Sequence, residues 1–337
     1  MPPPCQPLRQ LLPKNISLRV YNTDYDSCIR KAATLGFDSV GLRGTGIVGF
    51  ADEKKKATRE LADSLGVTLN YVAACGADLA SESGEERAVA VGQIGEILGA
   101  VASMGGTLVC GAFYAPWKGT LPAGVVDKRP NLERSARAMR EICRRADGLG
   151  IRINLEILNR YENYLLNTAS EGLEYLEAAG CGNLGPLLDT FHMNIEEETL
   201  PGAIRAAGDR LGHFHIGEAN RDVPGPGGHI PWPEVFAAIR DIGYPGIVEF
   251  EPFVTNGSEI AANIRPGDFP GEQFPGPVSG GHWSRIRGHC RKRGRTGRPR
   301  GSLPPPRSGE NTPRSRLPGR ALFHRRSGQP AGGHGKR

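Results

Sequence analysis

The sequence predicts an α/β fold, an eight-stranded (β/α)8 TIM barrel, and three observations support it. Strand-like and helix-like segments alternate along the chain. The strand-like runs are almost continuously apolar, as expected for parallel strands covered by helices. Eight such runs fit within about 250 residues, the usual size of one such barrel. A doubly wound sheet is the alternative arrangement of the same elements.

The first half of the chain contains four of these strands, and the first is the weakest. Residues 16–20 (ISLRV) count as a strand only provisionally, because Pro13 lies just before them and proline removes a donor from a sheet. Two of the helices that follow end on glycine, the residue that commonly terminates helices. The expected helix–strand pairs are 26–36 with 37–42, 52–66 with 67–73, and 85–104 with 107–113.

The second half repeats the same unit more regularly. Residues 132–150 form an amphipathic segment that ends on Gly150, and the apolar run 151–157 follows at once. The remaining helix–strand pairs are 170–180 with 184–189, 201–212 with 213–216, and 233–246 with 247–252.

Composition divides the chain near residue 265. Residues 266–337 hold 16 Lys and Arg against 3 Asp and Glu, and they are rich in glycine and proline. Such a segment buries too little apolar surface to offset its ordering entropy, so a disordered basic tail is expected. We therefore expect an irregular segment 1–15, a barrel domain 16–265 and a tail 266–337. The tail has a net charge of +13 and residues 1–265 have a net charge of −7, which together give the +6 of the whole chain. The basic total therefore describes the tail and does not predict a basic nucleic-acid-binding domain.

The cysteines and the apolar segments indicate a cytoplasmic protein. The seven cysteines are scattered, with no Cys-x-x-Cys pair, as is typical of a reducing compartment. The amino terminus has no apolar segment of signal-peptide length. The most apolar stretch, 98–117, is interrupted by four glycines and fits a helix end plus a strand better than a membrane span. No interaction with membranes is expected.

Four residues of metal-binding type lie at the carboxyl ends of four successive expected strands. They are Glu156, Asp189, His215 and Glu251, at intervals of 33, 26 and 36 residues, each about one strand–helix unit. This spacing places them side by side at the barrel mouth, where barrel enzymes carry out their chemistry. Three carboxylates and one imidazole suit Mn²⁺ or Mg²⁺ better than zinc. A single carboxylate at a strand end is often only a helix N-cap, but four in phase favour a site.

His213 is expected to have a structural role, facing away from His215 along the strand HFHI.

Several longer motifs are more specific indicators of a protein family. They are LEILNRYENYLLNT (155–168), LLDTFHMNIEE (187–197), GHFHIGEANR (212–221), IPWPEVFAAIRDIGYPG (230–246), EPF (251–253), VDKRP (126–130) and the YAPW that ends at Trp117. On these motifs the sequence resembles the ketose 3-epimerases, the D-tagatose and D-psicose (allulose) 3-epimerase group of the xylose isomerase-like barrels, over roughly residues 24–264.

The resemblance implies an isomerase that inverts C3 of a free ketose such as D-tagatose, D-fructose, D-psicose or ribulose through a cis-enediolate. It implies one Mn²⁺, or Mg²⁺ or Co²⁺, per chain, bound by Glu156, Asp189, His215 and Glu251. Glu156 and Glu251 are also the implied acid/base pair. These types make chemical sense, because inversion needs proton transfer on both faces of the sugar and stabilisation of the charge that develops.

The resemblance also implies four substrate contacts. Glu162, His192 and Arg221 would hydrogen-bond the O1–O3 end of the sugar, and Trp117 would form a wall beside it. A surface arginine is the alternative for Arg221, but its Gly/Pro-rich loop favours a lid. For Trp117, simple core packing is a comparable alternative. Relatives form dimers or tetramers, so a homodimer or homotetramer is expected.

Both ends of the chain depart from this family. The first strand lacks the family's aromatic cluster and has no aromatic residue before Tyr21, and after residue 265 the expected closing helices are replaced by the basic tail. A barrel without its last outer helix would expose strands one and eight, and a half-open barrel would hold the site loosely.

Three other functions are compatible with the sequence. Within enzymes, another xylose isomerase-like sugar isomerase or an inosose dehydratase-type lyase uses the same fold. In a different class, the RKRGRTGRPR run in the tail would bind nucleic acid non-specifically. An endonuclease on this barrel would need more histidines than the four before residue 266. A non-functional, truncated barrel is the third alternative.

Overall fold

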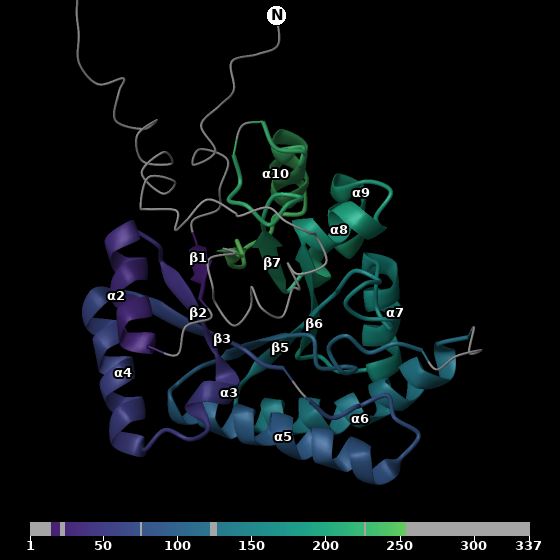
Figure 1. Ribbon diagram of the computed structural model, residues 1–337, viewed down its shortest axis with the longest axis horizontal. Helices are drawn as coiled ribbons and strands as arrows, with labels where there is room; N and C mark the ends of the chain where they lie inside the picture. The colour runs from purple at the N-terminus through teal and green to yellow at the C-terminus, as the bar shows by residue number, and fades with distance from the viewer. Residues whose placement is uncertain (1–14, 21–23, 75, 122–126, 226, 254–337) are drawn as a thin grey trace, which may run out of the picture. The chain divides into compact units, whose positions relative to one another are not determined.

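The computed structural model describes residues 15–20, 24–74, 76–121, 127–225 and 227–253, and these form a closed barrel of eight parallel strands (Figure 1). The predicted fold class is thereby confirmed. The strands are β1 (Ile16–Arg19), β2 (Ser39–Arg43), β3 (Thr68–Val72), β4 (Leu108–Gly111), β5 (Arg152–Glu156), β6 (Leu184–Asp189), β7 (His213–Ile216) and β8 (Val248–Phe250).

The barrel closes between its first and last strands. β1 pairs in parallel with β2 on one side and with β8 on the other, where Ser17 is opposite Glu249 and Leu18 is opposite Phe250. The eight strands therefore form a closed ring, which answers the question that the unusual first strand raised. Pro13 lies before the start of β1 and outside the described residues, so it takes no donor from the pairing of Ile16–Arg19. The basic tail and the segment after residue 253 also lie outside the described residues.

Helices surround the strands on the outside (Figure 1). Local chemistry sets their ends: Asp24 caps the first long helix by accepting from the Ser27 amide, and Gly36 and Gly66 end helices in the left-handed region. The helices are α2 (Tyr25–Leu35), α3 (Gly44–Ile47), α4 (Asp52–Leu65), α5 (Gly84–Ser103), α6 (Arg129–Gly148), α7 (Ala169–Ala179), α8 (Thr190–Glu196), α9 (Leu200–Ala207), η1 (Gly208–Arg210) and α10 (Trp232–Asp241).

The apolar core lies between the strands and these helices. At the closure, the ring of Phe37 packs edge-on against that of Phe250 with centroids 5.5 Å apart. In the described ranges, no helix combines the length and the apolar character that a bilayer span requires. The four described cysteines are free thiols, and burial raises the pKa of Cys110 to about 12. A thiol with so high a pKa forms little of the reactive thiolate at neutral pH.

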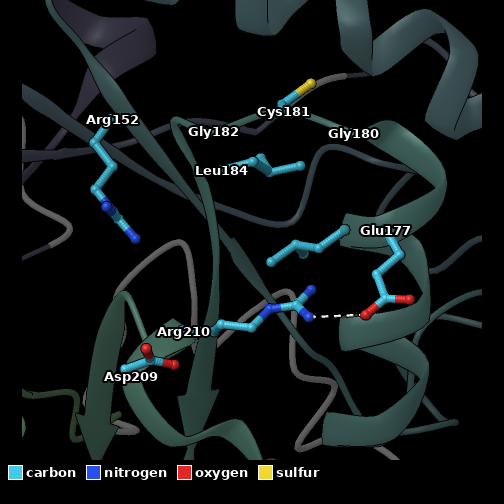
Figure 2. A pocket seen from close by; sticks show the side chains of 9 residues that line it. Arg152, Glu177, Gly180, Cys181, Gly182, Leu184, Asp209 and Arg210 are labelled. Atoms are coloured by element: carbon cyan, nitrogen blue, oxygen red, sulfur yellow. Dashed lines mark hydrogen bonds and ion pairs between the residues drawn. The ribbon is translucent and has the colours of Figure 1, made fainter.

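A surface pocket of about 390 Å³ lies at the amino ends of β5 and β6 (Figure 2). Arg152 and Leu184 begin these strands, and Asp209 and Arg210 precede β7. The guanidinium of Arg210 is already paired with Glu177 at 2.9 Å. In barrel enzymes chemistry takes place at the opposite, carboxyl ends of the strands. This pocket is therefore not the candidate active site.

Candidate active site

The four predicted metal-type residues meet at the carboxyl ends of the strands. Glu156 and Asp189 are the last residues of β5 and β6, His215 lies in β7, and Glu251 directly follows β8. All four are buried, and each offers a ligand atom within 4.8 Å of those of the other three. The spacing argument therefore placed these side chains correctly at one mouth of the barrel.

His215 lies at the centre of this cluster. Its Nδ1 is 3.2 Å from Oε2 of Glu251 and 3.6 Å from Oε1 of Glu156. Parallel pairing brings Asp189 opposite His215 in the sheet. The donor set is three carboxylates and one imidazole at close quarters, which fits a hard divalent cation such as Mn²⁺ or Mg²⁺.

Asp189 combines two roles that the sequence presented as alternatives. Its Oδ1 accepts a hydrogen bond of 2.8 Å from the amide of Phe191 and so caps α8. Its Oδ2 faces the cluster, 2.6 Å from Nη1 of Arg221. The cap fixes the rotamer of the carboxylate, because one oxygen is held by the helix while the other faces the site.

Mutual charge pairing keeps most of the cluster ionised. Burial acts to raise the pKa of Glu156, but hydrogen bonds from His192 and His215 outweigh it and hold that pKa well below its usual range. Burial opposes ionisation of Glu251 too, yet the charge of His215 lowers its pKa to about 2. The same carboxylates raise the pKa of His215 well above its ordinary value, although burial acts against this. Only at Asp189 does the effect of burial outweigh the nearby positive charges. Its pKa is raised, although the charge of Arg221 acts to lower it.

Arg221 reaches into this cluster from the loop after β7. Its guanidinium lies over the rings of Phe191 and Phe253, at 3.9 and 4.4 Å from their centroids, and Nη1 is 3.1 Å from Oε2 of Glu251. Its side chain is only 11% exposed, which excludes the alternative of a surface arginine. Its backbone φ of 62° is unusual for a residue other than glycine, so the surrounding loop holds it in a strained conformation.

His192 faces the cluster from α8, and its hydrogen bonds define where its proton lies. The backbone N–H of Asn159 is 3.1 Å from Nδ1 of His192, and Nδ2 of Asn159 is 2.8 Å from the same atom. A backbone N–H can only donate, so Nδ1 must accept, and the proton of the neutral ring lies on Nε2. That Nε2 is 3.6 Å from Oε1 of Glu156, the carboxylate toward which it can donate. Nη2 of Arg221 lies 2.9 Å from the same Nε2, but a guanidinium cannot accept, so this contact is not a hydrogen bond from the protonated ring.

Glu162 and Trp117 form the outer edge of the same site. The indole Nε1 of Trp117 donates to Oε2 of Glu162 at 3.3 Å. The side-chain amide Nδ2 of Asn159 donates to Oε1 of the same glutamate at 3.2 Å. Trp117 is 44% exposed, so simple core packing does not account for it. The contacts among Trp117, Glu162, Asn159 and His192 thus join all the predicted substrate residues to the metal-type cluster.

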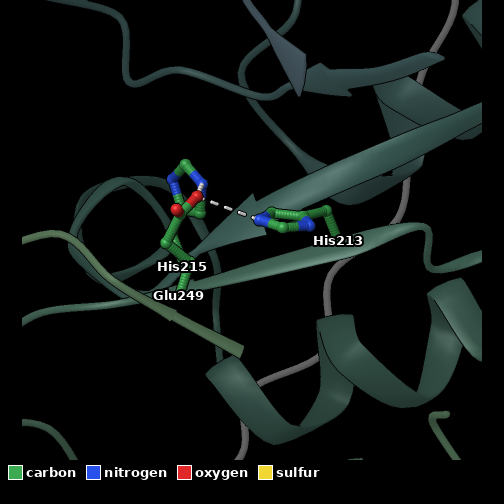
Figure 3. Close-up of side chains that lie close together, drawn as sticks. All are labelled: His213, His215 and Glu249. Atoms are coloured by element: carbon green, nitrogen blue, oxygen red, sulfur yellow. Dashed lines mark hydrogen bonds and ion pairs between the residues drawn. The ribbon is translucent and has the colours of Figure 1, made fainter. Parts of the chain in front are cut away.

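The prediction that His213 faces away from His215 is wrong. Residues two apart in a strand point to the same side, so both rings lie inside the barrel, with centroids 5.1 Å apart. Both rings contact Oε2 of Glu249 at 3.1 Å (Figure 3). Arg19 of β1 is also paired with Glu249. Sequence reasoning missed Glu249 and Arg19, although Glu249 precedes Glu251 by two residues and so shares its face.

A third missed residue, Glu218, organises the loop that carries Arg221. Its Oε1 accepts from the indole of Trp232 at 2.6 Å and from the amide of Gly225 at 3.1 Å. The other carboxylate oxygen, Oε2, lies against Gly228, where a Cβ would come within 2.0 Å of it. Only glycine therefore fits at this position without a shift of Glu218. The GHFHIGEANR string contains Glu218, but nothing in it indicates the indole partner 14 residues further on.

Comparison with known proteins gives consistent matches over the barrel. A family model described as xylose isomerase-like TIM barrel matches residues 29–267. The D-psicose 3-epimerase of Ruminiclostridium cellulolyticum is 38% identical over 247 residues, 73% of this chain and 84% of that protein. The D-psicose 3-epimerase of Agrobacterium fabrum is 38% identical over 249 residues, which cover 73% of this chain and 85% of that protein. A crystal structure of D-psicose 3-epimerase with D-tagatose from Clostridium cellulolyticum superposes with a TM-score of 0.71 at 37% identity, covering 74% of this chain and 89% of that one.

Proposed function

This chain belongs to the ketose 3-epimerase group of the xylose isomerase-like TIM barrels, and we propose that it inverts C3 of a free ketose in a metal-dependent reaction. The observation that supports the proposal most directly is the buried cluster of Glu156, Asp189, His215 and Glu251 at the carboxyl ends of β5 to β8. The chain is similar to sugar epimerases, which are isomerases that act on carbohydrates, and the proposed reaction belongs to the same class. D-Tagatose, D-fructose, D-psicose and ribulose are the candidate substrates.

One Mn²⁺, or Mg²⁺ or Co²⁺, per chain would be held by these four residues. The donor chemistry fits, and the cluster already attracts a cation, since the guanidinium of Arg221 contacts two of its carboxylates. When bound, the ion supplies Lewis-acid stabilisation of the negative charge that develops on the sugar oxygens.

Glu156 and Glu251 would carry the proton transfers at C3. Inversion requires a proton to leave one face of the carbon and another to arrive on the opposite face, so two carboxylates are needed. Both are buried, and interactions within the cluster hold both pKa values below the usual range. The step balances when one of the two enters it protonated: the ionised carboxylate takes the C3 proton, the protonated one delivers its proton to the opposite face, and the two exchange protonation states.

The remaining residues would orient the sugar. His192 presents an Nε2 proton that can donate to a substrate oxygen, and Arg221 places positive charge where negative charge develops. Glu162 accepts sugar hydroxyls at the edge of the site, and Trp117 covers one side of it. These contacts restrict the ketose to one pose and so bring C3 between the two carboxylates.

The direct test is an assay of the purified protein with Mn²⁺ on fructose, tagatose and ribulose, with products separated by chromatography. Epimerisation at C3 is the expected result. Absence of a C3 epimer from every ketose contradicts the proposal, and an aldose product instead identifies an aldose–ketose isomerase. Deleting residues 266–337 separates the nucleic-acid alternative, because that reading predicts lost nucleic-acid binding without a change in sugar turnover.

A further inference from the structure

A buried polar layer lies directly beneath the proposed metal ligands. Its centre is Glu249, in the middle of β8 and fully buried. Oε1 of Glu249 accepts from the hydroxyl of Ser17 at 2.9 Å, and Oε2 lies 2.9 Å from Nη2 of Arg19. The closure of the barrel creates this pair, since Ser17 and Arg19 come from β1 and Glu249 comes from β8.

His215 connects this layer to the site above it. Its Nδ1 faces Glu251 and Glu156, whereas its Nε2 lies 3.1 Å from Oε2 of Glu249. Figure 3 shows the carboxylate of Glu249 beside the ring of His215, with His213 on the other side. A carboxylate can only accept here, so Glu249 holds a proton on Nε2. Glu251 likewise faces a proton on Nδ1 in the metal-free ring, and this is the proton that a metal bound to Nδ1 would replace.

We propose that Glu249, held by Arg19 and Ser17, is the positioning residue that fixes the tautomer and orientation of His215 for metal binding through Nδ1. The inference rests on the metal site of the proposed function. A histidine that binds a metal through one nitrogen generally donates its other N–H to a carboxylate or carbonyl. Glu249 occupies that place, with Oε2 at 3.1 Å from Nε2 of His215.

The trio His213, His215 and Glu249 could also be read as a second metal site, because its ligand atoms lie close together. The position of Arg19 argues against this reading. Its guanidinium is 2.9 Å from Glu249 and 3.2 Å from Nε2 of His215, so a cation already neutralises this carboxylate. Arg19 can only donate, so this contact would be a hydrogen bond only if Nε2 of His215 carried no proton. The 3.1 Å contact of the same Nε2 to the carboxylate of Glu249 requires the proton instead.

The neighbouring strand is built to leave room for Glu249. A Cβ on Gly41 of β2 would come within 2.1 Å of Oε1 of Glu249 and within 2.8 Å of Oδ1 of Asn70. Asn70 itself donates to the hydroxyl of Ser17 at 3.0 Å. Side chains of β1 and β7 therefore hold the carboxylate in one place, and β2 leaves room for it, which is the property a positioning residue requires.

The first experiment measures binding of Mn²⁺ alone by calorimetry in the full chain. Glu249→Gln keeps the size of the side chain and removes its charge, and we expect the Kd for Mn²⁺ to rise about 10- to 100-fold. Arg19→Met is expected to weaken binding less than Glu249→Gln does, because the hydroxyl of Ser17 still holds Glu249 and a nearby positive charge is removed. Glu60→Gln, on the exposed face of α4, is the matched control with an unchanged Kd.

The second experiment locates the proton directly. In Mg²⁺-loaded protein labelled with ¹⁵N-histidine, two-bond ¹H–¹⁵N spectra should show the proton of His215 on Nε2, with the signal identified by its absence from His215→Asn. A proton on Nδ1, or a Kd for Glu249→Gln within twofold of the parent chain, overturns the inference.

A merely structural role is distinguished by the double variant Arg19→Met/Glu249→Gln, which leaves no unpaired buried charge. If Glu249→Gln fails to fold, this variant still decides, because the proposal requires its Kd to rise as well. Unchanged Mn²⁺ binding in the folded double variant overturns it. Failure of the parent chain to bind Mn²⁺ overturns both this inference and the proposed metal site, whereas normal binding without epimerisation contradicts only the proposed reaction.

Discussion

Nη1 of Arg221 lies 2.6 Å from Oδ2 of Asp189, although the two residues come from different strand ends and are 32 positions apart. A second carboxylate, that of Glu251, is 3.1 Å from the same nitrogen. Arg221 thus places a positive charge on two of the proposed metal ligands. The guanidinium and a divalent cation would compete for the same oxygens. Removing the guanidinium should therefore change how strongly the cation stabilises the protein.

Arg221→Gln is expected to lower the melting temperature of the metal-free protein by several degrees, because buried carboxylates lose their cation. Added Mn²⁺ should then raise the melting temperature more than it does in the parent chain. Thermal melts with and without Mn²⁺ measure both effects. Arg205→Gln, which breaks an exposed pair with Asp241, is the control and should change little. An equal Mn²⁺ shift in Arg221→Gln and parent chain would contradict the competition.

Glu156→Gln and Glu251→Gln should each reduce epimerisation by about 10²- to 10⁴-fold, the usual contribution of a general acid or base. The informative measurement is exchange of the C3 hydrogen in D₂O, followed by NMR for each epimer separately. Each variant should retain exchange with the epimer handled by the surviving carboxylate and lose it with the other. Mn²⁺ content is measured in parallel, and loss of both exchanges with full metal content would refute the two-base assignment.

Gly228→Ala should disturb the loop that carries Arg221, because the new Cβ would lie 2.0 Å from a carboxylate oxygen of Glu218. We expect kcat/KM to fall about tenfold. Gly225→Ala is the matched control in the same loop, where the nearest atom to a new Cβ is 3.7 Å away. Steady-state kinetics on both variants test this, and equal losses would mean that general loop stiffness, not Glu218, is responsible.

Trp117→Ala should raise KM several-fold while leaving the free energy of unfolding within about 1 kcal/mol, since the side chain is 44% exposed. Tyr161→Ala removes an even more exposed aromatic residue nearby and should leave both quantities unchanged. Kinetics and denaturant titrations decide. A large loss of stability in Trp117→Ala without a change in KM would return Trp117 to a packing role.

The metal-free protein should lose stability in acid through Glu251. Its folded-state pKa is lowered from 4.5 to about 2, so its contribution is complete above pH 4.5 and disappears as the pH falls toward 2. His215 has the opposite sign: its pKa is raised above 6.5, so its contribution is present below pH 6.5 and is lost as the pH rises through the folded-state value. Melts from pH 2 to 9 should therefore peak between about pH 4.5 and 6.5, where both contributions are present. Glu251→Gln should flatten the acid limb, and an unchanged acid limb would contradict this assignment.

Strand order and the four metal-type residues were predictable from the sequence, because each barrel unit repeats one strand and one helix. That regularity places Glu156, Asp189, His215 and Glu251 at equivalent strand ends without knowledge of any side-chain contact. The resemblance to ketose 3-epimerases, drawn from motifs such as LLDTFHMNIEE, was confirmed by the comparisons. The error at His213 came from misapplying the two-residue period of a strand and not from missing information.

Other features depended on the closed barrel itself. Arg19 and Glu249 are 230 residues apart in sequence, and they meet only because β1 pairs with β8. Asp189 proved to be both helix cap and site residue, since its two oxygens face different partners. The sequence by itself determined which chemical groups lie at the barrel mouth, because strand periodicity is local. Tertiary structure alone decided which charges pair beneath that mouth, because pairing depends on distances that only ring closure creates.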